Sequence, residues 1–179
     1  MAEEDRSVVT DHSLAKLERV GAGTAIAADI FGLVGKSQFF AEFSQEDISV
    51  LAGYMEVYRA QPGEILIREG EEGDFMVLIV DGEIDILKKN RRGEQYHMTS
   101  AGPGMTLGEM SMIDGEPRFA TCMAAQSTTF AVLTRDNMAK IILDHSGLGS
   151  KILVKMVTML SLRLRQTSER MLRMMEERQ

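Results

Sequence analysis

The residues best suited to bind a ligand lie in one stretch, residues 107–121, which reads LGEMSMIDGEPRFAT. Gly108, near its start, lets the backbone approach a ligand closely because it has no side chain. Arg118, near its end, carries a guanidinium that can hold a phosphate with two parallel hydrogen bonds. This combination predicts a loop that binds an anionic ligand.

Two further features of the stretch agree with such a site. Met110, Met112 and Ile113 predict one apolar helical turn under the strands, whose first backbone N–H groups are left for an anion. The Glu109 carboxylate is an acceptor suited to sugar hydroxyls. Because it is negatively charged and close to the expected anion, it is not expected to bind the anion itself. From the spacing alone, an exposed loop with an ion pair between Glu109 and Arg118 is the alternative.

The chain around this stretch is organised as short strands. Apolar runs alternate with turn signals such as Pro62-Gly63, Asp81-Gly82 and Asp114-Gly115 over residues 54–133, which is the spacing of an antiparallel barrel or sandwich. The predicted strands are residues 55–60, 65–68, 75–80, 83–88, 95–100, 120–124 and 128–134.

Capping signals predict helices on both sides of the strands. Ser44 and Asp47 form a capping box ahead of a helix over residues 45–53. Thr134 can cap a second helix over residues 135–143. The strands are therefore expected to lie between short helices.

A long helix is predicted at the C-terminus. Gly147 and Gly149 are expected to break the chain, after which Ser150 caps a helix that runs from residue 151 to near the end. One stripe of this helix follows coiled-coil spacing for three heptads, and Thr167 is its single polar member. The apolar members of this seam are Leu153, Val157, Leu160, Leu164, Met171 and Met174.

The first 36 residues give weaker signals. Residues 13–20 predict a short helix, which the cluster Gly21-Ala22-Gly23 then interrupts. No strand is expected before these glycines, so they are not expected to bind phosphate.

Composition excludes several classes of protein. The formal net charge of −7 disfavours general affinity for nucleic acid or anionic membranes. Cys122 is the only cysteine, so no internal disulfide is expected. The N-terminus has no apolar segment of the signal type, and the longest apolar run, residues 75–80, is too short to span a bilayer. We expect a cytoplasmic protein without a metal site or a catalytic set of residues.

The stretch 107–121 resembles the phosphate-binding cassette of the cyclic nucleotide-binding domain family, which includes the catabolite activator protein and regulatory subunits of cAMP-dependent protein kinase. The glycine pattern of residues 67–74, Gly82 and residues 102–104 is similar to that of the family as well. The resemblance covers about residues 39–171. It implies a mostly β fold with flanking helices, a jelly-roll β-barrel (double-stranded β-helix) followed by a long C-terminal dimerisation helix.

The resemblance also implies roles for individual residues. Glu109 accepts from the ribose 2′-hydroxyl, with the Gly108 N–H nearby. Arg118 binds the exocyclic phosphate oxygens, and Ser111 and Phe119 donate backbone N–H groups. Met110 lies within the same segment, and the sugar and base are lined by Ile86 and Met98.

Phe119 departs from the family pattern, in which Ala, Ser or Thr often follows the cassette arginine. A hydroxyl at this position often accompanies a preference for cGMP, because it can bind the guanine amino group. Phe119 has no hydroxyl, which favours cAMP over cGMP.

The stretch 164–170 resembles the adenine-reading part of the dimer helix in the catabolite activator protein type. By that likeness, Thr167 contacts the adenine amino group within its own subunit, and Ser168 reaches the adenine of the partner subunit. Arg163, one turn earlier, faces the cassette and can pair with Glu109.

These observations predict three parts: an N-terminal extension (1–36), a cyclic nucleotide-binding barrel (37–149) and a dimerisation helix (150–179). The expected function is cAMP sensing by a homodimer that is not an enzyme. Transcription factors of this type continue into a DNA-binding domain, whereas this sequence ends at Gln179, so we expect signalling through an unidentified protein and no binding to nucleic acid or membrane.

Three alternatives remain open. In the first, the pocket binds cGMP or another nucleotide instead of cAMP. In the second, the protein is a dimeric interaction module with a degenerate pocket that Phe119 plugs. In the third, it is a haem or redox sensor with His97 as the candidate ligand, although a lone strand histidine is usually an ordinary side chain.

Overall fold

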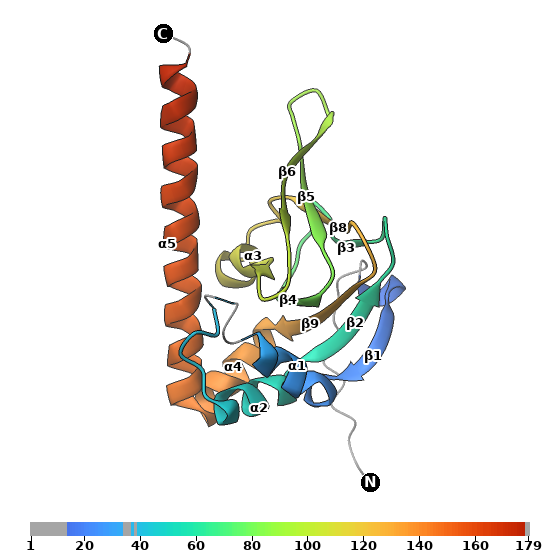
Figure 1. Cartoon of the computed structure of the whole chain (residues 1–179), viewed down its shortest axis with the longest axis vertical. Coiled ribbons are helices and arrows are strands. Elements are labelled where there is room, and N and C mark those ends of the chain that lie inside the picture. The colour runs from blue at the N-terminus through green and yellow to red at the C-terminus, as the bar shows by residue number, and fades with distance from the viewer. Residues whose placement is uncertain (1–13, 34–36, 38, 178–179) are drawn as a thin grey trace.

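The structure is a computed structural model that describes residues 14–33, 37 and 39–177. Two antiparallel sheets pack face to face, helices cover one of them, and a long helix stands beside them (Figure 1). This arrangement confirms the predicted jelly roll with flanking helices and a long C-terminal helix. The remaining residues of the predicted N-terminal extension, 1–13 and 34–36, lie outside the described residues.

The first sheet has the strand order β1-β2-β9-β4-β7, and the second has the order β3-β8-β5-β6. Each predicted strand is present within one or two residues of its expected bounds. The strands are β1 Glu18–Ala22, β2 Glu56–Ala60, β3 Ile65–Ile67, β4 Phe75–Asp81, β5 Ile84–Lys89, β6 Gln95–Ala101, β7 Thr106–Leu107, β8 Thr121–Ala124 and β9 Thr128–Thr134.

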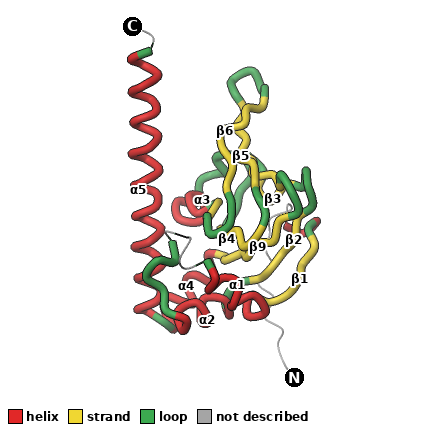
Figure 2. Tube along the Cα trace, in the orientation of Figure 1, coloured by secondary structure: helices red, strands yellow, loops and turns green. Residues whose placement is uncertain are grey.

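Along the chain, the helices come before β2, between β7 and β8, and after β9. They are the 3₁₀ turns η1 Leu14–Lys16 and η2 Gly23–Ile26, followed by α1 Ala27–Gly32, α2 Gln45–Gly53, α3 Glu109–Asp114, α4 Arg135–Asp144 and α5 Ser146–Glu176. Figure 2 shows that α1, α2 and α4 gather against the first sheet, whereas α5 continues well past them. Among the helices that the structure describes, none combines the length and the apolar character needed to cross a membrane.

Strand β4 explains how the core is divided. Its residues from Phe75 to Ile79 are all buried, because each face of the strand meets a different layer. Phe75, Val77 and Ile79 pack between the two sheets. Met76 and Leu78 pack against the helices. A continuous apolar run is typical of such a strand, which is covered on both faces.

The predicted caps are present. The Asp47 N–H donates to Ser44 Oγ at 3.1 Å, and the Ser44 N–H donates to Asp47 Oδ2 at 2.9 Å. At the start of α4, the Asn137 N–H donates to Thr134 Oγ1 at 3.2 Å. Both helices therefore begin at the residues that their caps predict.

The prediction for residues 13–20 was wrong over the part that the structure describes. Only η1 is helical there, and β1 follows at the edge of the first sheet. Its residues are mostly exposed, so the strand has no apolar period to detect, and pairing with β2 stabilises it instead. Gly23 comes next, where any Cβ would overlap the Ala52 carbonyl of α2.

The predicted start of the last helix was also wrong. Helix α5 begins at Ser146, so Gly147 and Gly149 lie inside its first turns rather than before it. A Cβ at Gly149 would lie 2.8 Å from Ile142 Cα in α4. Gly149 therefore permits the close approach of α4 and α5, a packing role that outweighs its low helix propensity.

Candidate functional site

A cavity of about 120 Å³ lies between α3, β5, β8 and α5. Most of the residues that the sequence singled out line it. These residues are Ile86, Gly108, Glu109, Met110, Ser111, Arg118, Phe119 and Arg163, and Ile67, Leu107, Ala120 and Cys122 complete the lining.

Gly108 shapes the backbone where α3 begins. Its φ of 81° lies in the left-handed region, which residues with a side chain rarely adopt. A Cβ at this position would also lie 2.7 Å from Arg118 Nη1. Both constraints call for glycine, and they allow the α3 backbone to reach the cavity wall.

Arg118 is 2% exposed, which is unusual for an arginine. Its Nη1 donates to the carbonyls of Phe75 at 2.8 Å and Gly108 at 3.0 Å, and its guanidinium lies 4.3 Å from the centre of the Phe75 ring. A Cβ at Gly73 would overlap the same guanidinium. The structure thus holds a cation in place at the cavity before any ligand arrives.

Glu109 places a carboxylate beside that cation. It is 3% exposed, and burial raises the pKa of its carboxyl, while the charges of Arg163 and Arg118 act in the opposite direction. Its Oε1 accepts from Arg163 Nη1. Its Oε2 is buried and has no hydrogen-bond partner among the described residues, so this oxygen can accept from a ligand hydroxyl.

Arg163 brings α5 to the site. Besides its ion pair with Glu109, its Nη2 donates to the Thr106 carbonyl at 2.6 Å. The ion pair agrees with the pairing that the sequence predicts. Arg163 also lines a second hollow of about 330 Å³, between α5 and the turn before β7, together with Met105, Leu162 and Gln166.

Arg135 holds α3 in place beside the cavity, and nothing in the sequence indicated this role. Its Nε donates to the Met112 carbonyl at 2.8 Å and its Nη2 to the Ser111 carbonyl at 2.7 Å. These bonds satisfy carbonyls of α3 and tie it to the start of α4. Its position at the start of a predicted helix gave no sign of this role, because the contact joins segments more than twenty residues apart.

Phe119 lies at the margin of the cavity and does not fill it. Its ring is 54% exposed, and Lys88 Nζ lies 4.3 Å from the ring centre. A plug would be buried among the lining residues, so the geometry gives the plugged-pocket alternative no support. Lys88 was also missed by the sequence analysis.

Three predicted residues do not line the cavity. Met98 lies on β6 with 49% of its surface exposed. The hydroxyls of Thr167 and Ser168 donate to the carbonyls of Arg163 at 2.8 Å and Leu164 at 2.9 Å, within α5 itself. Both residues are exposed on the part of α5 beyond Arg163.

The candidate haem ligand His97 and the single cysteine, Cys122, both have ordinary surroundings. His97 is exposed on β6, where its Nε2 lies 3.0 Å from both Asp85 Oδ1 and Ser100 Oγ. Burial raises the pKa of the Cys122 thiol to about 12, so it stays protonated and unreactive. Within the described part of the chain, no cluster of three or more potential metal ligands occurs.

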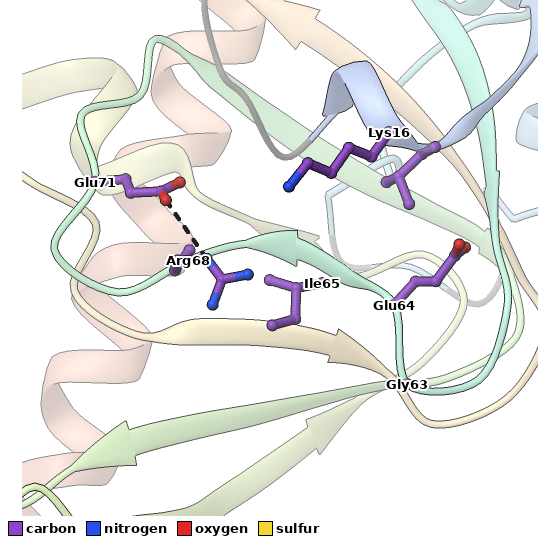
Figure 3. A pocket seen from close by; sticks show the side chains of 7 residues that line it. Lys16, Gly63, Glu64, Ile65, Arg68 and Glu71 are labelled. Carbon is purple, nitrogen blue, oxygen red and sulfur yellow. Dashed lines mark ion pairs between the residues drawn. The ribbon is translucent and has the colours of Figure 1, made fainter.

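A further hollow, of about 250 Å³, lies near the start of β3. Figure 3 shows Lys16 from η1 and Arg68 on its walls, with the Arg68 Nε bound to Glu71 Oε1 at 3.4 Å. The carboxylate of Glu64 also lines the hollow and accepts from the Gln61 N–H at 2.7 Å. Charges of both signs line this hollow, so it has no net preference for an anion.

Known proteins share both the sequence pattern and the fold. The model of the cyclic nucleotide-binding domain matches residues 57–145. A crystal structure of a cyclic nucleotide-binding domain from Methylobacillus flagellatus KT is 34% identical, with a TM-score of 0.81, over 91% of this chain and 92% of that chain.

More distant relatives include larger proteins. The cAMP-dependent protein kinase regulatory subunit of Yarrowia lipolytica is 25% identical over 78% of this chain, which spans 38% of the length of that subunit. The catabolite activator protein of Thermus thermophilus has the same fold, with a TM-score of 0.69 at 21% identity over 75% of this chain and 62% of that chain.

Proposed function

Because the chain belongs to the cyclic nucleotide-binding domain family, we propose that it is a regulatory module whose ligand is cAMP. The observation that carries this proposal is the placement of a buried cation, Arg118, and a buried carboxylate, Glu109, on the wall of one cavity. A cyclic nucleotide offers the matching groups, because its phosphate is an anion and its ribose keeps a free 2′-hydroxyl.

Arg118 binds the exocyclic oxygens of the phosphate. Water is largely excluded around its guanidinium, so charge-assisted hydrogen bonds there are stronger than at an exposed site. The backbone N–H groups of Ser111 and Phe119 add donors to the same phosphate. The carbonyls of Phe75 and Gly108 keep the guanidinium in place, so little side-chain entropy is lost on binding.

Glu109 binds the ribose. Its Oε2 accepts from the 2′-hydroxyl, and the Gly108 N–H lies beside it in the chain. Arg163 supports this role, because a cation at the other carboxylate oxygen favours the ionised form that accepts hydrogen bonds.

The base extends toward α5. The cavity of about 120 Å³ is smaller than the roughly 300–1,000 Å³ usual for small-molecule sites, so it suits the phosphate and sugar rather than a whole nucleotide. Ile86 lines the inner wall. Neither Thr167 nor Ser168 lines the cavity, so they meet the base where it extends beyond the cavity. Thr167 then reads the adenine of its own subunit, and Ser168 reads the adenine of a second copy of the chain.

That second copy binds along α5. The far part of the helix exposes a broad apolar stripe that nothing in the described chain covers, and its spacing suits a parallel coiled coil. Exposed apolar residues of the helix include Leu153, Val154, Val157, Leu164, Met171, Leu172, Met174 and Met175.

The preference for cAMP over cGMP rests on Phe119 and Thr167. Phe119 has no hydroxyl for the guanine amino group. The Thr167 hydroxyl can accept from the adenine amino group but can only donate to the guanine carbonyl, so its discrimination is partial.

Domains of this family are typically non-catalytic, and we propose that this protein also acts by binding alone. Its net charge of −7 disfavours direct contact with nucleic acid, so the signal passes to another protein. The coupled elements are α3 at the cavity and α5 at the dimer stripe, which the Glu109–Arg163 pair joins.

Calorimetric titration of the purified protein with cAMP, cGMP and 5′-AMP tests this function. We expect cAMP to bind more tightly than cGMP, and 5′-AMP to bind weakly because its phosphate is not cyclic. Arg118→Lys keeps a positive charge near the buried site but loses the fork of donors, so it should lower the cAMP affinity at least tenfold. Equal binding by the wild type and Arg118→Lys would exclude the phosphate assignment.

A further inference from the structure

Phe119 presents an aromatic ring at the mouth of the cavity, and the local backbone dictates this placement. Its neighbours Arg118 and Ala120 are buried, with 2% and 8% of their surface exposed. Because both neighbours face inward, the ring between them faces outward, and it lines the cavity while 54% of its surface stays exposed. A half-exposed phenyl ring at a ligand cavity has an unused apolar face.

Lys88 of β5 holds the ring on one side. Its Nζ donates to the Phe119 carbonyl at 2.5 Å and to Glu69 Oε1 at 2.9 Å, and it lies 4.3 Å from the ring centre. Glu69 is itself held, because its Oε2 accepts from the Lys89 N–H at 3.0 Å. The ammonium is thus fixed above the ring by two acceptors rather than by a single exposed ion pair.

From this geometry we infer that Phe119, backed by Lys88, is a stacking platform for the base of the bound nucleotide. The inference rests on the proposed function and assigns a base contact on the barrel side, opposite α5. Aromatic side chains stack on any base because every base has a π face. The platform therefore favours the larger purines over pyrimidines, and it does not separate adenine from guanine.

The experiment measures dissociation constants of cAMP, cGMP and cCMP by calorimetry for the wild type, Phe119→Leu, Lys88→Met and Tyr96→Leu. Phe119→Leu keeps an apolar side chain without a π face. It should lower the affinities for cAMP and cGMP about tenfold each, and the affinity for cCMP less. Lys88→Met keeps the aliphatic stem and removes the ammonium, so it should lower the same affinities by a smaller factor, again more for the two purine nucleotides than for cCMP. Tyr96 is a matched control, because its ring is 56% exposed on β6 and does not line the cavity.

Proton NMR of bound cAMP adds a readout that a merely structural role would not change. Stacking on the ring should shift the adenine H2 and H8 resonances upfield in the wild type, and Phe119→Leu should abolish that shift. Unchanged affinities, an unchanged purine-to-pyrimidine ratio or unshifted base protons would overturn the platform while leaving the proposed function standing.

Two other outcomes also overturn the inference. If Phe119→Leu binds cAMP more tightly than the wild type, the ring obstructs the pocket. If the wild type binds no cyclic nucleotide at all, the proposed function itself fails, and the platform fails with it.

Discussion

Arg163 of α5 donates to the buried carboxylate of Glu109 in α3, although 54 residues separate them in the sequence. The same arginine donates to the carbonyl of Thr106 at the start of β7. A ligand that binds Glu109 therefore contacts a carboxylate that is already paired with α5, so we expect the occupancy of the cavity and the position of α5 to affect each other.

Arg163→Met should destabilise the protein in a pH-dependent way. The variant leaves the buried Glu109 carboxylate without its main cation, at a cost of about 1–3 kcal/mol at pH 8. Burial already raises the folded-state pKa of Glu109 above its ordinary value, and losing Arg163 raises it further. An acid with a raised folded-state pKa gains stability as pH falls through that pKa, so the deficit should shrink toward pH 5.

Denaturant unfolding between pH 5 and pH 8 measures this effect. Glu109→Gln in the Arg163→Met background should remove the pH dependence, and Arg165→Met, which removes an exposed cation two residues away, should change little. A deficit that is constant across this pH range would show that Arg163 stabilises the protein by packing rather than by charge.

Gly73→Ala should weaken ligand binding without touching the ligand. The new Cβ would overlap the guanidinium of Arg118, which must shift away from the carbonyls that position it. We expect at least a fivefold loss of cAMP affinity by calorimetry while the protein stays folded. Gly53→Ala is the control, because its new Cβ would meet no residue beyond its chain neighbours and its own helix backbone within 4 Å. Equal affinities for the two variants would show that the cavity tolerates a displaced Arg118.

Two glycines at the start of α5 should respond in opposite directions. Gly147→Ala meets open space inside the helix, so it should stabilise the protein by up to about 1 kcal/mol through helix propensity. Gly149→Ala places a Cβ 2.8 Å from Ile142 Cα and should destabilise the protein by about 1–3 kcal/mol through overpacking. Thermal unfolding of both variants checks whether the helix begins at Ser146; similar destabilisation by both would place its start later.

Leu164→Glu should dissociate the proposed dimer. Leu164 is 68% exposed in a single chain, so the change leaves the subunit fold intact but places a carboxylate in the middle of the apolar stripe. Sedimentation velocity at micromolar concentration should show a dimer for the wild type and a monomer for the variant. Arg165→Glu adds a carboxylate beside the stripe, and this control should stay dimeric. If the Leu164→Glu variant still forms a dimer, this face of α5 is not the dimer interface.

Thr167→Val should separate dimerisation from base recognition. The valine keeps the shape of the side chain and suits an apolar seam, so the dimer should be preserved or tightened. The loss of the hydroxyl should weaken the binding of cAMP by about 1 kcal/mol and reduce the protein's preference for cAMP over cGMP. Sedimentation and calorimetry on the same variant test both parts, and weaker dimerisation with unchanged selectivity would make Thr167 a packing residue.

Local patterns in the sequence were sufficient for most of the fold. The capping box of Ser44 and Asp47 forms within four residues, and the strands alternate with turn residues that leave few choices of backbone conformation. The stretch around Gly108 and Arg118 is likewise contiguous, so its resemblance to a ligand-binding segment is visible from the sequence alone.

Features that depend on distant partners were missed or misplaced. Strand β1 is exposed and has no apolar period, and it forms because β2 offers it an edge. Gly149 reads as a helix breaker until α4 lies against it. The support of α3 by Arg135 and the contact of Lys88 with Phe119 join segments that the sequence does not relate.

The sequence by itself determined the family, all the strands except β1 and β7, and the residue types that a cyclic nucleotide needs. Tertiary structure alone decided which of these residues share a cavity: it brought Arg163 to Glu109, placed the Phe119 ring at the mouth and left Thr167 outside. The physical reason is the separation along the sequence between the residues that interact. Caps and turns depend on neighbours a few residues away, whereas the burial of Glu109 and the charge that balances it depend on how whole elements pack together.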